Sequence, residues 1–335
     1  MKIKHILTAL LVIISFSSFC IIPDDQGSGN SQQQKPKAPL AQRIGHYDKS
    51  KAFAGKNVHD GTGTLYMQTL LNRDAVTNLN FMHKGPLMPK SSIGHHFHFD
   101  SDEMFLILDG DCEFTVNGHT AALPAPVGVP CPSRNSHAVY NPSADKAADW
   151  VNFNVRVTAP ASAGQGAGPA AAPGGFGQRG SFNYSADPTG TFNLGDDRSS
   201  VKLEKPTFIH TGHLVKDQMR PYANMTGGKD TVFYRRALGP SAFVSNWAFV
   251  DHLLIPPKAS VGKHFHAGVD EVYLVIKGKG VVQVNDETAE VAYGDAIPIR
   301  AGEIHSLENN SNEPFEMIIY GIALEKGKLD ITAVK

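Results

Sequence analysis

Residues 92–110 read SIGHHFHFDSDEMFLILDG, and residues 260–278 read SVGKHFHAGVDEVYLVIKG. The two stretches superimpose after a shift of 168 positions, without a gap. Each carries two histidines separated by one residue, a glutamate five positions later and a glycine seven positions after that. A further histidine follows each glutamate by 34 residues, at His137 and His305. Agreement at this density predicts an internal duplication with a long period, because chance does not place His and Glu twice at one spacing.

The same offset extends on both sides of these stretches. It pairs Asn78 with Asn246, Phe81 with Phe249, Pro89-Lys90 with Pro257-Lys258, Val116-Asn117 with Val284-Asn285, Pro130 with Pro298, and Asn141 with Asn309. Two copies of one folding unit are therefore expected.

The secondary structure of both copies is predicted to be β. Residues 104–108 and 272–276 are short apolar runs of strand length, and each is followed by a glycine-containing turn. Residues 114–116 and 281–284 follow as the next strands, and residues 150–157 and 315–322 are expected to be the last ones. No segment of either copy shows a convincing helical period, so an all-β sandwich or small barrel is favoured.

The repeated residues are typical of a metal site. Alternate residues of a strand point to one face, so His96 and His98 project together, as do His264 and His266. Three imidazoles and one carboxylate suit a first-row transition metal, and four protein ligands leave positions open for water, O2 or substrate. The predicted ligand sets are His96, His98, Glu103 and His137 in the first copy, and His264, His266, Glu271 and His305 in the second. A single His-x-His pattern more often lies on a protein surface without binding metal. Here the complete pattern of three His and one Glu occurs twice at the same spacing, which favours metal sites.

Both copies resemble cupin domains, and the whole chain resembles a bicupin. The first cupin motif, G(X)5HXH(X)3–4E(X)6G, is matched except at its leading glycine, where Lys90 and Lys258 stand. The second motif, G(X)5PXG(X)2H(X)3N, is matched at Gly294, Gly302, His305 and Asn309 and at Pro132, His137 and Asn141; Arg300, Pro126 and Arg134 depart from it. These departures concern turns rather than ligands. The resemblance covers roughly 240 of the 335 residues.

The resemblance implies two tandem double-stranded β-helix barrels (RmlC-like jelly rolls), each holding one divalent transition metal, Fe, Mn, Ni, Cu or Zn. It leaves open whether both sites are occupied, and it does not specify the reaction, because one fold hosts many functions. The favoured expectation is an enzyme acting on a small oxygen-rich organic substrate, an oxidoreductase such as a dioxygenase, or a decarboxylase. A carbohydrate-active isomerase, epimerase or lyase and a non-catalytic binding protein are the alternatives. The resemblance also allows a homodimer.

The ends and the middle of the chain differ in composition from the two copies. Residues 1–22 are expected to be a signal peptide or lipoprotein signal, with Lys2 and Lys4 before an apolar run, and residues 23–39 a flexible tether. The first cupin domain is predicted over 40–158 and the second over 199–326, followed by a tail at 327–335. Between them lies a linker over 159–198, in which 17 of the 22 residues from 159 to 180 are Ala, Gly or Pro.

The protein is expected to be exported. The protein is placed in the periplasm or cell envelope, either cleaved or held at a membrane through a lipidated Cys20. The other cysteines, Cys112 and Cys131, would be two buried thiols, with a disulfide as the alternative. The net charge is −1, which argues against a nucleic-acid partner and leaves a small-molecule substrate as the expected ligand.

Several further residues are candidates for roles at the sites. Glu103 and Glu271 are candidate catalytic acid–base groups as well as ligands, and Arg300 or Arg134 could bind a substrate carboxylate, although surface pairing is the commoner role of such an Arg. Glu303 is a weaker candidate for a general base. Tyr273 and Gln283 replace Phe105 and Thr115, so an inward orientation would make the second cavity the more polar. The other candidates without ligand spacing are His46, His59, His119, His210, His213 and His252, which are expected at the surface or in loops.

Overall fold

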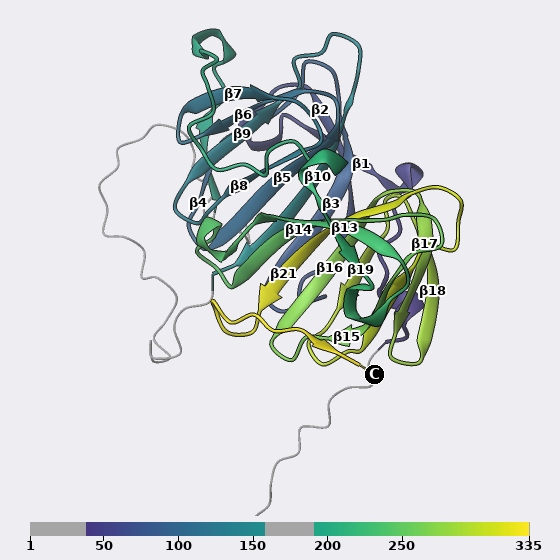
Figure 1. Ribbon diagram of the computed structural model, residues 1–335. Coiled ribbons are helices and arrows are strands. Elements are labelled where there is room, and N and C mark those ends of the chain that lie inside the picture. Colours follow the sequence, from purple (N-terminus) through teal and green to yellow (C-terminus); the bar gives the residue numbers. More distant parts are fainter. Residues whose placement is uncertain (1–37, 158–190, 335) are drawn as a thin grey trace, which may run out of the picture. The chain divides into compact units, whose positions relative to one another are not determined.

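The computed structural model describes residues 38–157 and 191–334 (Figure 1). The predicted signal segment, most of the tether and the Ala/Gly/Pro-rich part of the linker lie outside these residues. In the part that is described, no helix has the length and apolar character needed to span a bilayer. The described chain is almost entirely β, which confirms the predicted fold class.

The first half forms two antiparallel sheets, of strand order β1-β2-β3-β10-β5-β8 and β11-β4-β9-β6-β7. Its strands are β1 (Phe53–Lys56), β2 (Thr64–Leu71), β3 (Leu79–Leu87), β4 (Ser92–His98), β5 (Ser101–Asp109), β6 (Cys112–Val116), β7 (His119–Leu123), β8 (Val127–Cys131), β9 (Ser136–Tyr140), β10 (Ala148–Arg156) and β11 (Thr191–Gly195). The predicted hairpin turn between β6 and β7 has Asn117 and Gly118 at φ 51° and 84°, the left-handed pair that a tight two-residue hairpin requires.

The second half repeats the pattern, with strand orders β12-β13-β14-β21-β16-β19 and β18-β17-β20-β15-β22. Its strands are β12 (Arg220–Ala223), β13 (Thr231–Leu238), β14 (Trp247–Ile255), β15 (Ser260–Phe265), β16 (Val269–Lys277), β17 (Lys279–Val284), β18 (Glu287–Ala292), β19 (Ala296–Ile299), β20 (His305–Glu308), β21 (Phe315–Ala323) and β22 (Thr332–Ala333). The predicted duplication is therefore visible strand by strand, from purple and blue in the first half to green and yellow in the second (Figure 1).

The described helices are all short. They are α1 (Leu40–Arg43) and the 3-10 turns η1 (Lys49–Lys51), η2 (Val58–Asp60), η3 (Arg198–Ser200), η4 (Lys216–Gln218), η5 (Met225–Gly227) and η6 (Pro240–Ala242).

The central strands of both six-stranded sheets are buried on both faces. On β5, Phe105 belongs to the interior cluster of the first barrel, whereas its neighbour Met104 belongs to a cluster shared by both halves. In that shared cluster the ring of Phe153 (β10) stacks on Tyr320 (β21) at 4.3 Å between centroids. Burial of alternate residues on opposite faces explains why these strands read as continuous apolar runs rather than alternating ones.

Each half also contributes a segment to the other barrel. Leu40 and Ile44, from the start of the first predicted domain, are buried in the core cluster of the second barrel. In return, the backbone N–H of Thr211 donates to the carbonyl of Gly128 in the first barrel, at 2.9 Å, and Leu214 is buried in the shared cluster. The boundary that composition suggests along the chain therefore does not separate the packing of the two halves.

An edge strand from beyond each barrel pairs with the strand that carries the His-x-His pattern. β11, at the end of the predicted linker, pairs with β4, and β22, in the predicted tail, pairs with β15. Each of these segments lies outside the two predicted domains, and each supplies ladder hydrogen bonds beside a candidate metal site. Cys112 and Cys131 are buried and unbridged.

Candidate metal centres

The two facing sheets of the first barrel bring the four predicted ligands together. His96 and His98 lie on β4, His137 lies opposite His96 on β9, and Glu103 reaches in from β5 of the other sheet. The Nε2 atom of His137 is 3.0 Å from Nε2 of His98 and 3.1 Å from Nε2 of His96. Glu103 Oε2 lies 2.6 Å from His98 Nε2 and 3.2 Å from His137 Nε2. All four side chains are buried.

These separations fit a transition-metal ion. Metal–nitrogen bonds of about 2.1 Å place two ligands about 3.0 Å apart when they subtend a right angle, and about 3.4 Å apart in a tetrahedron. The two contacts that His137 makes with the other imidazoles agree with the right angle. Ligands at right angles suit a five- or six-coordinate cation, on which four protein ligands leave positions open to outside molecules.

The electrostatics of the first centre also suit a cation. Burial lowers the pKa of His96 well below its ordinary value and that of His137 to about 4. Burial alone would raise the pKa of Glu103, but the facing imidazoles of His98, His137 and His96 bring it well below its ordinary value. At neutral pH His96 and His137 are therefore neutral and Glu103 is ionised, which are the protonation states that bind metal.

The second barrel assembles the equivalent set from the equivalent strands. His264 lies on β15, and His266 is the first residue after that strand. His305 is the first residue of β20, and Glu271 lies on β16. Glu271 Oε2 is 3.1 Å from His305 Nε2 and 3.5 Å from His266 Nε2, and one ligand atom from each of the four residues lies within 4.8 Å of the others. Burial lowers the pKa of His264 to about 4. Burial alone would raise the pKa of Glu271, but the facing imidazoles of His305 and His266 lower it to about 2.

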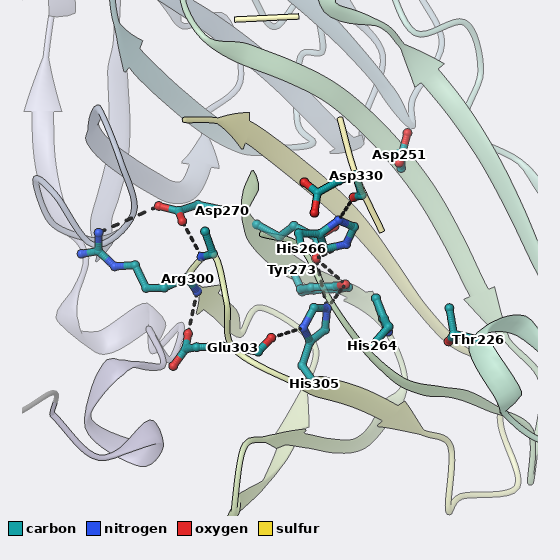
Figure 2. Close-up of polar contacts among 12 residues, drawn as sticks. Thr226, Asp251, His264, His266, Asp270, Tyr273, Arg300, Glu303, His305 and Asp330 are labelled. Atoms are coloured by element: carbon teal, nitrogen blue, oxygen red, sulfur yellow. Dashed lines mark hydrogen bonds and ion pairs between the residues drawn. The ribbon is translucent and has the colours of Figure 1, made fainter. Parts of the chain in front are cut away.

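Backbone carbonyls orient the imidazoles of the second centre, and Figure 2 shows the contacts from Glu303 to His305 and from Asp330 to His266. Nδ1 of His264 donates to the carbonyl of Gly262, and Nδ1 of His305 to the carbonyl of Glu303, each at 3.0 Å. Nδ1 of His266 donates to the carbonyl of Asp330, in the segment that leads into β22. Because a carbonyl only accepts, these bonds place the proton on Nδ1 and leave the Nε2 lone pair free to bind a cation. In the first centre His96 is held in the same way by the carbonyl of Gly94.

Each cluster opens onto a cavity. The first cavity has a volume of about 300 Å³ and the second about 450 Å³. Among the described residues that line the first cavity, Glu103 is the only acidic one and there is no Lys or Arg; its other polar side chains include His59, His83 and Asn152. The second cavity contains Arg236, Asp251 and Asp330 besides Glu271.

Each of the charged groups that the second cavity adds to Glu271 has a partner in the protein. Arg236 donates from Nε and Nη2 to the two carboxylate oxygens of Asp251, at 2.9 and 3.0 Å, and Tyr234 donates its hydroxyl to the same carboxylate at 2.5 Å. Asp330 accepts from the backbone N–H of Gly268 at 2.9 Å. The wall of this cavity therefore carries more charged side chains than that of the first.

Of the two second-half residues expected to increase polarity, Tyr273 points inward and Gln283 does not. The hydroxyl of Tyr273 lies 2.9 Å from Glu271 Oε2 and 3.1 Å from His305 Nε2. Gln283 instead donates to the carbonyl of Asn285 at a hairpin. In the first half Phe105 occupies the position of Tyr273, and its ring stacks on His137 at 4.2 Å.

The predicted auxiliary residues Arg300 and Glu303 lie away from the cluster. The Arg300 guanidinium contacts Asp270 and the carbonyl of Asp74, and Arg300 does not belong to the lining of the second cavity (Figure 2). The Glu303 carboxylate is 3.0 Å from Arg43, and only its backbone carbonyl reaches a ligand, His305. Neither side chain therefore belongs to the described lining of the second cavity.

Sequence analysis missed three residues of the first cavity. His59, expected in a loop, stacks on His96 at 3.8 Å between ring centroids. Asn152 of β10 donates to Glu103 Oε1, and burial lowers the pKa of His83 to about 4. The repeat offers one signal for His83. A shift of 168 positions aligns His83 with Asp251, so both copies carry an ionisable residue at this position, and each lines its own cavity. His59 and Asn152 carry no spacing that links them to the ligands.

Comparison with known proteins points to one family. The family described as "Cupin domain" matches residues 86–154 and again residues 251–321. An oxalate-binding protein of Thermotoga maritima is 33% identical over 102 residues, which cover 30% of this chain and 84% of that protein. The tetracenomycin polyketide synthase protein TcmJ of Streptomyces glaucescens is 31% identical over 84 residues, covering 25% of this chain and 56% of that protein.

Solved structures resemble the two-barrel arrangement. Oxalate decarboxylase from Bacillus subtilis aligns with 86% of this chain and 78% of its own, at 14% identity and a TM-score of 0.54. The oxalate decarboxylase of Lactobacillus farciminis, in a formate complex, aligns with 86% of this chain and 88% of its own, at 15% identity and a TM-score of 0.53. At this level of identity the likeness concerns the fold.

Proposed function

Because this chain belongs to the cupin family and carries one cupin domain in each half, we propose that it is a metal-dependent bicupin enzyme acting on a small carboxylate. The first centre, His96, His98, Glu103 and His137, is the proposed reaction site. The observation that carries the proposal is the convergence of three imidazole nitrogens and one carboxylate oxygen, at separations suited to a cation, at the wall of a cavity.

The charge of the first cavity supports a carboxylate ligand. A divalent cation there would be only partly neutralised by Glu103, and the described lining contains no other carboxylate. His83 is neutral because burial lowers its pKa to about 4. The remaining positive charge, in a site with little competing water, attracts an anion. The name of the Thermotoga relative, an oxalate-binding protein, supports a small dicarboxylate in particular.

The chemistry that we propose is cleavage of a carbon–carbon bond next to a carboxylate, either as decarboxylation or oxidatively with O2. A bound divalent metal would act as a Lewis acid or redox centre for the carboxylate oxygens. The chain itself contributes the Asn152 amide, which holds Glu103 through its outer oxygen. Phe105 and Trp150 form an apolar part of the cavity wall and exclude water.

We further propose that the protein is exported. The support is the apolar run at residues 6–22 behind Lys2 and Lys4, with Cys20 as a candidate lipidation site. Intact mass measurement of the protein recovered from the cell envelope tests this. A cleaved or lipidated N-terminus is expected, and an intact Met1 in a cytosolic fraction would contradict it.

A binding protein without turnover is the second candidate, and the name of the Thermotoga relative favours it as well. Both candidates need the metal and the ligand, and they differ only in product formation.

Assays of metal content and turnover test the proposal. The purified protein is analysed for metal and incubated with oxalate and related mono- and dicarboxylates, while CO2 release and O2 uptake are followed. About two divalent metals per chain and CO2 release are expected, and O2 uptake separates the oxidative from the non-oxidative reaction. Binding without turnover would assign the protein to the second candidate, and absence of metal would contradict both.

Variants of the first centre locate the reaction. Glu103→Gln and His96→Ala should abolish turnover, since each removes a ligand. The matched control is His119→Ala, because this exposed histidine lies on the surface of the same barrel, and its ion-pair partner among the described residues is Glu204, at 2.9 Å. Activity that survives Glu103→Gln would place the reaction elsewhere.

A further inference from the structure

The hydroxyl of Tyr273 lies among the ligand atoms of the second centre. It is 2.9 Å from Glu271 Oε2 and 3.1 Å from His305 Nε2, and the side chain is buried (Figure 2). Both of those atoms are the ones that face the cation in the proposed ligand set. A hydroxyl that merely oriented Glu271 would be expected on the outer oxygen, as Asn152 is on Glu103 Oε1 in the first centre.

The two distances equal those between ligands of one cation. Atoms bound about 2.1 Å from a metal and at right angles to each other lie about 3.0 Å apart. The Tyr273 hydroxyl meets this condition with two ligands at once, as His137 does with His96 and His98 in the first barrel. Oε2 of Glu271 and Nε2 of His305 both present lone pairs, and the single O–H proton of Tyr273 can be donated to only one of them, so a cation is the group that can accept from all three atoms at once.

We propose that the oxygen of Tyr273 is an additional ligand of the cation at the second centre, which the first centre lacks. This inference rests on the proposed metal centres. When the oxygen binds, the O–H bond breaks, the proton passes to water, the oxygen–metal bond forms, and no electron is transferred. The first centre cannot do the same, because Phe105 stands at the equivalent strand position and its ring lies flat on His137.

The difference assigns different tasks to the two centres. On a six-coordinate cation, the four ligands of the first centre leave two positions, enough for a carboxylate or dicarboxylate to chelate. A fifth ligand at the second centre leaves one position, which excludes chelation. Turnover of a small carboxylate is therefore confined to the first barrel, and the second cation is held mainly by the protein.

Ferric iron is the probe for the test, because a phenolate bound to Fe(III) absorbs visible light whereas imidazole and carboxylate ligands do not. The full chain carrying His96→Ala and His98→Ala leaves the second centre as the iron site. We expect one iron per chain, a visible absorption band, and enhanced tyrosine ring modes on resonance Raman excitation into that band. These measurements are made on the parent and do not depend on the folding of a tyrosine variant.

Two tyrosine variants in the same background assign the band. Tyr273→Phe should remove it and weaken Mn(II) binding about 10- to 100-fold in a chelator competition. Tyr234→Phe is the matched control, because its hydroxyl lines the same cavity but donates to Asp251, and it should keep the band. A colourless parent with one iron bound, or a band that survives Tyr273→Phe, would overturn the ligand and leave the metal centre intact. Failure of both centres to bind any cation would instead overturn the proposed function, and this inference with it.

Discussion

The two barrels present the same four ligands but surround them differently. In the first cavity the described lining adds no further Asp or Glu to Glu103 and no Lys or Arg, and its polar groups include Asn152 and the neutral His83. In the second, Arg236 carries one positive charge, while Glu271, Asp251 and Asp330 carry three negative charges. A divalent cation would leave the first cavity positive and bring the second close to neutral. The comparison teaches that duplication can preserve a set of four candidate ligands while the charge of the surrounding cavity walls diverges.

The edge segments that lie beside the two centres also differ. In the second barrel Asp330 orients His266 through its carbonyl and accepts the N–H of Gly268 through its side chain, so the C-terminal segment is part of the site. In the first barrel the corresponding edge strand β11 pairs with β4, and Asn193 contacts His59 at 3.0 Å. In the second centre, the C-terminal segment therefore contacts a proposed ligand, His266, directly. In the first centre, β11 contacts His59, which is not a proposed ligand but stacks on His96.

The largest expected effect is the loss of one centre at a time. His264→Ala with His266→Ala should empty the second centre and leave the first barrel folded, and the changes at His96 and His98 should do the reverse. Metal per chain, measured by elemental analysis, should fall from two to one in either case. If neither pair changes the metal content, the ligand assignment is wrong.

Removal of the C-terminal segment should weaken the second centre selectively. A chain ending at Lys328 loses the carbonyl that holds the Nδ1 proton of His266, and loss of such a partner lowers metal affinity about 10- to 100-fold. Chelator competition on single-centre variants measures this. The first centre serves as the internal control, and equal weakening of both would point to a general loss of structure.

The Arg236–Asp251 pair should stabilise the second barrel without binding metal. Arg236→Ala leaves Asp251 buried with Tyr234 as its remaining hydroxyl partner, which should lower the free energy of unfolding by about 2 kcal/mol, less than a fully buried pair because Arg236 is partly exposed. Adding Asp251→Asn should recover part of the loss, since the buried charge is gone. Urea unfolding of the single and double variants tests this, and additive losses would contradict the coupling.

The smallest expected difference lies in the response to acid. A lowered histidine pKa keeps the nitrogen unprotonated to lower pH, so protons compete less with the metal. Burial lowers the pKa of His96 and His137 in the first centre and of His264 in the second. Both centres should therefore keep their metal as the pH falls from 7 towards 5 and release it nearer pH 4, with little difference between them. Metal retention by single-centre variants after equilibration at each pH measures this, and release already between pH 7 and 6 would contradict it.

Much of this architecture could be predicted because duplication made the pattern visible twice. The strand runs at 104–108 and 272–276, the turn at Asn117-Gly118 and the four ligands of each half all follow from local periodicity and spacing. Residues whose roles depend on neighbours remote in sequence could not be predicted. His59 reaches His96 through a turn, Asn152 reaches Glu103 across adjacent strands, and Arg300 lies against Asp74 of the other half.

The sequence by itself determined the all-β class, the duplication and the identity of the candidate ligands, because strand periodicity and residue spacing are properties of short segments. Only the tertiary structure decided that Leu40 and Ile44 pack in the second barrel, that the sheets pack through Phe153 and Tyr320, and that Tyr273 points into a metal centre. These features arise from burial of surfaces that meet after the strands have paired. No local pattern encodes which apolar face meets which, because the hydrophobic effect is not directional.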